Sequence, residues 1–120
     1  MAALNLLEDL GGRHIAVLGD MLELGYMEEE GHRLVGRRVA DVAQVLVTMG
    51  QRARWIAEEA RKVGMRPEQV VMVDDVETAV STLQDLIQPH DMVLVKGSLG
   101  MKMSRIVAAL SVEDKSEEAA

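Results

Sequence analysis

The 120-residue sequence contains no cysteine and no phenylalanine, and its aromatic residues are a single tryptophan and a single tyrosine. Without cysteine the chain can form no disulfide, no thiolate zinc site and no cysteine nucleophile. With so few aromatic rings it offers no platform on which successive nucleic-acid bases could stack. The net charge of −7 also argues against a nucleic-acid surface, which needs clustered lysine and arginine.

Targeting and membrane signals are lacking as well. Residues 1–10 carry acidic side chains and have no basic start, unlike a signal peptide. No apolar run approaches the roughly 20 residues that a membrane-spanning helix needs. We therefore expect a soluble, cytoplasmic protein, whose hydrophobic fraction of 48% suits one globular domain with its own core.

Four short apolar runs, rich in valine and isoleucine, predict strands at residues 15–18, 45–47, 70–73 and 92–95. None of them alternates with polar residues, which is typical of strands that are covered on both faces. The sequence therefore favours a parallel sheet buried between layers of helices.

Helical patterns flank each run. We expect helices over residues 2–10, ended by Gly11-Gly12, from the acidic residues 28–30 onward, and over 53–63, ended by Gly64. Two more are expected over 76–87, with Asp75 as N-cap, and over 103–110, followed by a flexible acidic tail at 111–120. Val63 and Val107 are assigned to the apolar faces of their helices.

Alternating strands and helices predict an α/β fold, Rossmann-like and doubly wound, with a mostly parallel sheet and helices on both faces. Right-handed crossovers place all strand-to-helix loops at one edge of the sheet, so we expect any ligand site there. These loops are residues 19–25, 49–52, 74–76 and 96–101.

The most informative of these loops begins with Lys96-Gly97-Ser98 at the end of the last strand. The ammonium of Lys96 could bind a phosphate or carboxylate held over the Gly97 and Ser98 amides. Equally, Lys96 could extend from a strand end into solvent while the glycines supply turn geometry. The segment lacks the GxxxxGK[ST] spacing of a triphosphate-binding loop, and so does the rest of the chain.

Gly19-Asp20 ends the first strand and offers the second candidate. The Asp20 carboxylate, with Glu23 close in sequence, could bind a ligand ammonium or a metal-bound water. It could also cap the following turn, which we favour from the residues alone. The paired Asp74-Asp75 is characteristic of receiver domains, but there it follows the first strand and here the third. We therefore set that family aside.

The remaining histidines and the tryptophan have structural interpretations. His32 shares a helical face with Val35 and Val39, so a packed or interdomain histidine is favoured over a catalytic one. His14 and His90 are interpreted as loop residues preceding strands. Trp55 falls beside the apolar face of its helix and is expected to cover a helix edge or to meet a partner.

Two stretches together, IAVLGDMLELG at residues 15–25 and VLVKGSLGMKM at residues 93–103, resemble the C-terminal domain of the Mur ligases. The stretch EEEGHRLVGRRVA is similar to that family's acidic helix start followed by His-x-x-Val-Gly. The resemblance covers nearly the whole chain and is strongest toward the branch that adds D-alanyl-D-alanine. Residues 1–110 would form that domain.

The resemblance implies a three-domain enzyme of peptidoglycan synthesis that needs ATP and Mg²⁺. Its members convert the carboxylate of UDP-MurNAc-tripeptide into an acyl phosphate, which the amine of D-Ala-D-Ala then attacks. The nucleotide loop and the magnesium ligands belong to a central domain. We therefore expect this chain to lack the N-terminal and central domains and the hinge before Met1, to hold no cofactor of its own, and to be inactive alone.

Carried over by position, the resemblance assigns substrate-facing roles to Asp20, Met21, Glu23, Lys96, Gly97 and Ser98. Lys96 with Ser98 would bind the dipeptide carboxylate, and Asp20 would orient its amine. Leu99 departs from the family, since many relatives have a basic residue there, and Met49 replaces a smaller one.

Two other readings remain open from the sequence. The chain could be a free-standing Rossmann-like module that binds a small anion or serves regulation. It could also be an interaction domain in which the loop motifs serve only to form the turns of the backbone. A nucleotide-binding GKT domain encoded upstream would decide for the ligase.

Overall fold

The computed structural model describes residues 2–22 and 28–110 of the chain. The strands are β1 (His14–Gly19), β2 (Val45–Met49), β3 (Val70–Val73) and β4 (Met92–Lys96). The helices are α1 (Ala2–Glu8), α2 (Glu28–Val42), α3 (Ala53–Lys62) and α4 (Val76–Leu86), with short 3-10 turns η2 (Pro67–Gln69) and η3 (Leu99–Met101). Residues 103–110 form a further helix.

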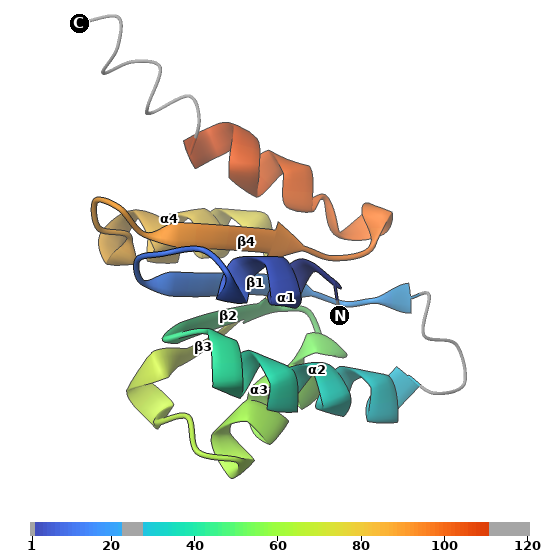
Figure 1. Cartoon of the computed structure of the whole chain (residues 1–120). Coiled ribbons are helices and arrows are strands. Elements are labelled where there is room, and N and C mark those ends of the chain that lie inside the picture. Colours follow the sequence, from blue (N-terminus) through green and yellow to red (C-terminus); the bar gives the residue numbers. More distant parts are fainter. Residues whose placement is uncertain (1, 23–27, 111–120) are drawn as a thin grey trace, which may run out of the picture.

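The strands form one sheet in the order β3-β2-β1-β4, and every pairing is parallel (Figure 1). The central strand β1 is buried along its whole length because strands lie on both sides of it and helices cover both faces. Its residue Leu18 is in register with Thr48 of β2 and Lys96 of β4. The carboxyl ends of these three strands therefore meet at one edge of the sheet.

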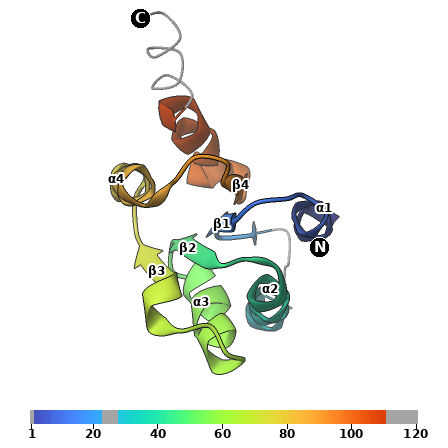
Figure 2. The ribbon, with the colours of Figure 1, turned by 60° about the vertical axis from the view of Figure 1, so that its left-hand side comes forward.

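Helices cover both faces of the sheet, as the sequence predicted (Figure 2). Successive strand residues point to opposite faces, so Ala16 and Leu18 pack beneath α1, α2 and α3 while Ile15 and Val17 pack beneath α4 and the 103–110 helix. The doubly wound α/β fold is confirmed. Within the described ranges, no helix combines the length and the apolar character required to cross a bilayer.

Local sequence signals explain how two of the helices begin and end. The Asp75 carboxylate accepts the Thr78 N–H at 2.7 Å and caps α4, as expected. At the end of α3, Gly64 adopts a φ of +130°, and the Met65 N–H donates to the Ala60 carbonyl at 3.0 Å. This bond is the long hydrogen bond of a Schellman motif, which needs a residue of positive φ.

Three predictions about individual positions were wrong. The first helix ends at Glu8, before Gly11-Gly12, because the next residues form a tighter turn and His14 contacts the Leu10 carbonyl at 2.6 Å. His14 is itself a buried strand residue, and its other ring nitrogen lies 2.9 Å from the Val42 carbonyl. Val63, at the C-cap just past the end of α3, and Val107 are about half exposed and do not belong to the buried faces of their helices.

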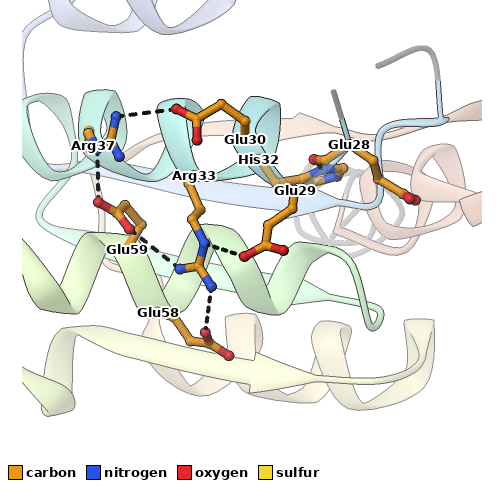
Figure 3. Close-up of polar contacts among 8 residues, drawn as sticks. All are labelled: Glu28, Glu29, Glu30, His32, Arg33, Arg37, Glu58 and Glu59. Carbon is orange, nitrogen blue, oxygen red and sulfur yellow. Dashed lines mark hydrogen bonds and ion pairs between the residues drawn. The ribbon is translucent and has the colours of Figure 1, made fainter. Parts of the chain in front are cut away.

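The α2–α3 pair is held closely by a glycine and by a buried carboxylate. A Cβ at Gly36 would lie 2.5 Å from the Ile56 carbonyl oxygen, so only glycine allows this approach. Next to it, the carboxylate of Glu59 accepts a hydrogen bond from Arg37 at 2.8 Å and pairs with Arg33 at 3.4 Å (Figure 3). The hydrogen bond from Arg37 is the main cause of the lowered pKa of Glu59.

Candidate functional site

The loops that follow β1 and β4 lie side by side, because the two strands are neighbours in the sheet. β1 ends in Gly19 and Gly97 directly follows β4, and these two glycines meet without a side chain between them. A Cβ on Gly97 would lie 3.2 Å from the Gly19 Cα and 2.8 Å from the Met103 Cγ. Gly97 is therefore required by close packing, since its φ is not positive.

Direct hydrogen bonds join the two loops. The Ser98 N–H donates to the Asp20 carbonyl at 2.8 Å, and the Leu22 N–H donates to Ser98 Oγ at 2.5 Å. The structure thus brings together the two segments that the sequence singled out. It also corrects one detail, because the Ser98 amide is engaged by Asp20 and does not face an anion.

Lys96 is the cation of this corner. Its side chain is exposed at the end of β4, and within residues 2–22 and 28–110 it forms no ion pair. An exposed ammonium without a carboxylate partner in the described chain is suited to binding an external anion. The same exposure agrees with a lysine that only extends into solvent, so geometry alone leaves its role as a prediction.

Asp20 is a buried capping residue, but the helix it caps is distant in sequence. Its Oδ1 accepts the N–H of Ala53 at 2.8 Å, at the first turn of α3, and its side chain is 9% exposed. The other oxygen, Oδ2, lies 3.6 Å from a guanidinium nitrogen of Arg52. The carboxylate does cap a helix, but this helix is α3 and not the turn that follows Asp20, as the sequence had suggested.

Gly50 makes room for this carboxylate. It has a φ of +109°, and a Cβ there would lie 2.5 Å from Asp20 Oδ1. Any other residue would be strained by its backbone conformation and would displace the aspartate. The end of β2 thereby belongs to the same cluster of loops as the ends of β1 and β4.

The other two predicted residues of the first loop contribute differently. The side chain of Met21 is 4% exposed and packs in the core beneath α1, α2 and α3, so it presents no surface to a ligand. Its N–H donates to Nε2 of His32 at 3.0 Å. Glu23 lies outside the described residues, and its proposed contact with the substrate stays a prediction.

An open pocket of about 230 Å³ lies beside this cluster and is lined by Glu28, Gln51, Arg52 and Trp55. Arg52 pairs with the carboxylate of Glu28 as well as with Asp20. The sequence placed the 49–52 loop at this edge, but it could not reveal the Arg52 pairs, which join three separate segments. No group of three histidine or acidic side chains in the described part of the chain could hold a metal ion.

Comparison with known proteins adds the following likenesses. The sequence profile described as "Mur ligase, glutamate ligase domain" matches residues 1–99. The UDP-N-acetylmuramoyl-tripeptide–D-alanyl-D-alanine ligase of Bacillus subtilis (strain 168) is 34% identical over 112 residues, which cover 91% of this chain and 24% of that protein.

Solved structures show the same fold. A crystal structure of MurF from Acinetobacter baumannii has a TM-score of 0.76 and 30% identity, covering 91% of this chain and 24% of that one. MurF ligase from Thermotoga maritima in complex with ADP has a TM-score of 0.74 at 24% identity, covering 98% and 26%. The chain thus spans about a quarter of the length of the relatives it matches.

Proposed function

The chain belongs to the Mur ligase family, in which it corresponds to the glutamate ligase domain, and on this premise we propose that it is the amino-substrate domain of a cytoplasmic ligase joining D-Ala-D-Ala to UDP-MurNAc-tripeptide. The likeness to the UDP-N-acetylmuramoyl-tripeptide–D-alanyl-D-alanine ligase of Bacillus subtilis supports this assignment of the substrates. The observation that carries the proposal is the corner at the carboxyl edge of the sheet, where exposed Lys96 stands beside the joined Asp20 and Ser98 segments.

In this proposal the domain binds and orients the dipeptide. Lys96 binds its carboxylate as a point charge, and Ser98 fixes the corner by holding the loop after β1. Asp20 contributes negative charge toward the amine, while its bond to Ala53 keeps it in place. Holding the amine near an acyl phosphate makes the reaction effectively unimolecular, and closure over it would limit hydrolysis.

ATP and Mg²⁺ do not fit this chain by itself. The sequence has no triphosphate-binding loop, and the described residues offer no group of metal ligands. We propose that the nucleotide and metal are bound by other domains of the ligase. The activation of the acceptor carboxylate would take place there, and this domain would deliver the amine.

A domain exchange tests the proposal. The matching C-terminal quarter of the Bacillus subtilis ligase is replaced by this chain, and ATP-dependent joining of D-Ala-D-Ala is measured. We expect ligation, and we expect Lys96→Ala to raise the KM for D-Ala-D-Ala or to lower turnover at least tenfold, about 1.4 kcal/mol. The control Lys62→Ala, an exposed lysine at the end of α3, should leave the kinetics unchanged.

Besides a hybrid that does not ligate, two outcomes would contradict the proposal. Unchanged kinetics for Lys96→Ala would show that the Lys96 side chain only extends into solvent and does not bind the dipeptide. A hybrid that joins a different amino substrate in preference to D-Ala-D-Ala would refute the dipeptide assignment.

A second candidate, a free-standing module for a small anion, is favoured by one observation. Lys96, Ser98 and Asp20 meet within this single chain. If the module is complete, inorganic phosphate should shift the amide resonances of Gly97 and Ser98 in the chain alone, and Lys96→Ala should abolish the shifts.

A further inference from the structure

His32 is the most deeply buried imidazole near the site. It lies close to the start of α2, beside Glu28 (Figure 3), and its side chain is 0% exposed. A fully buried histidine requires partners for its polar ring atoms. Both ring nitrogens have backbone partners on opposite sides of the imidazole.

These partners determine the protonation of the ring. Nε2 lies 3.0 Å from the Met21 nitrogen, whose N–H can only donate, so Nε2 must accept. Nδ1 lies 2.5 Å from the Glu28 carbonyl oxygen, which can only accept, so Nδ1 must donate. The imidazole is therefore neutral and carries its proton on Nδ1.

The bond from Met21 completes the anchoring of the first loop. Asp20, on one side of it, accepts the Ser98 N–H through its carbonyl, and Leu22, on the other, donates to Ser98 Oγ. Three consecutive residues are thus held by backbone hydrogen bonds, two to the β4 corner and one to α2. Without an acceptor at Nε2, a buried N–H would be left unpaired and the loop would shift to satisfy it.

We propose that His32 is a positioning residue of the dipeptide corner: as a neutral imidazole it holds the Asp20–Ser98 junction in register with Lys96. This inference rests on the proposed function and deepens it. Trp55 supports the ring from α3, with its centroid 5.8 Å from that of His32 at an interplanar angle of 61°, an edge-to-face arrangement. Through these contacts, His32 of α2 and Trp55 of α3 are linked to the loop after β1, which faces the substrate in the proposed function.

The first test uses the whole 120-residue chain and needs no activity. The imidazole ¹⁵N resonances should show a protonated Nδ1 and an unprotonated Nε2. The opposite tautomer would overturn the proposal without any variant being made.

Two matched variants then separate the two bonds. The side-chain amide of His32→Gln lies as many bonds from Cβ as Nε2 does, so it can still accept from Met21. In His32→Asn the amide lies at the level of Nδ1 and cannot reach Met21. We expect the Met21 amide to exchange at least about tenfold faster in His32→Asn than in His32→Gln, with Val17 still protected in both. Equal exchange in two folded variants would refute the role.

The kinetic test uses the hybrid ligase. His32→Asn should raise the KM for D-Ala-D-Ala at least about tenfold, while the KM for ATP stays within about twofold. His32→Gln should return the KM for D-Ala-D-Ala to that of the unsubstituted hybrid. An equal rise in the KM for D-Ala-D-Ala and in the KM for ATP would indicate a merely structural role and contradict the proposal. If the unsubstituted hybrid does not ligate, the proposed function fails, and the resonance and exchange measurements still decide the role of His32.

Discussion

At the scale of individual residues, the ion pairs of this chain differ in how deeply their charged side chains are buried. The Asp91 side chain is 4% exposed, and Arg13 binds it through both Nε, at 3.2 Å, and a terminal nitrogen, at 2.7 Å. Arg54 and Asp74 form an exposed pair at 3.2 Å. Exposed pairs contribute little to stability, whereas removing one partner of a buried, hydrogen-bonded charge is costly.

The Asp91 pair should make stability depend on pH. The hydrogen bond from Arg13 is the main cause of the lowered pKa of Asp91. The unfolded chain therefore binds its proton at a higher pH, so the stabilisation is complete above the ordinary aspartate pKa and is lost as the pH falls toward the lowered one. We expect Asp91→Asn to cost about 2 kcal/mol at neutral pH in urea unfolding, and the difference from the unsubstituted chain to narrow below about pH 4.

Asp74→Asn is the matched control, and we expect it to change the free energy of unfolding by less than about 0.5 kcal/mol. A deficit for Asp91→Asn that stays constant down to acidic pH would show that its charge is not the source of the effect.

At the level of elements, the crossing of α2 and α3 determines where the site residues are held. His32 comes from α2, while Ala53 and Trp55 come from α3. Their relative position depends on the approach at Gly36, where a Cβ would contact the Ile56 carbonyl at 2.5 Å.

Gly36→Ala should therefore destabilise the chain, even though alanine favours a helix by about 1 kcal/mol over glycine. The contact is with backbone and can be relieved only by moving α3, so we expect a net loss of about 1–3 kcal/mol in urea unfolding. Gly11→Ala is the control, because a Cβ there meets no atom within 4 Å and Gly11 does not have a positive φ. Stability that rises in Gly36→Ala would contradict the close approach.

For the whole molecule, the doubly wound sheet gathers its strand-to-helix loops at one edge, and in the proposed function other parts of a ligase complete the active site. The chain covers about a quarter of the relatives it matches, and its sequence has no triphosphate loop. We therefore expect the purified 120 residues neither to hydrolyse ATP nor to join D-Ala-D-Ala to UDP-MurNAc-tripeptide. Release of phosphate above background, or formation of the amide, would refute this prediction.

Much of the fold could be predicted because its signals are local. Unbroken apolar runs placed the four strands, Asp75 and Gly64 identified helix ends, and the alternation of elements gave the doubly wound topology. The errors occurred where tertiary contacts override local preference, as at α1, which ends early where His14 meets the Leu10 carbonyl.

The sequence by itself determined the family resemblance, the parallel sheet and the edge at which the motifs meet, because these depend on periodicity and on residues adjacent in the chain. Only the tertiary structure decided what the motif residues do. Asp20 caps a helix that begins more than thirty positions later, and the Ser98 amide binds Asp20 in place of an anion. The Met21 N–H, in the loop after β1, donates to His32 of α2. Such bonds depend on which strands become neighbours and how closely helices approach, and neither is encoded in the spacing of any single motif.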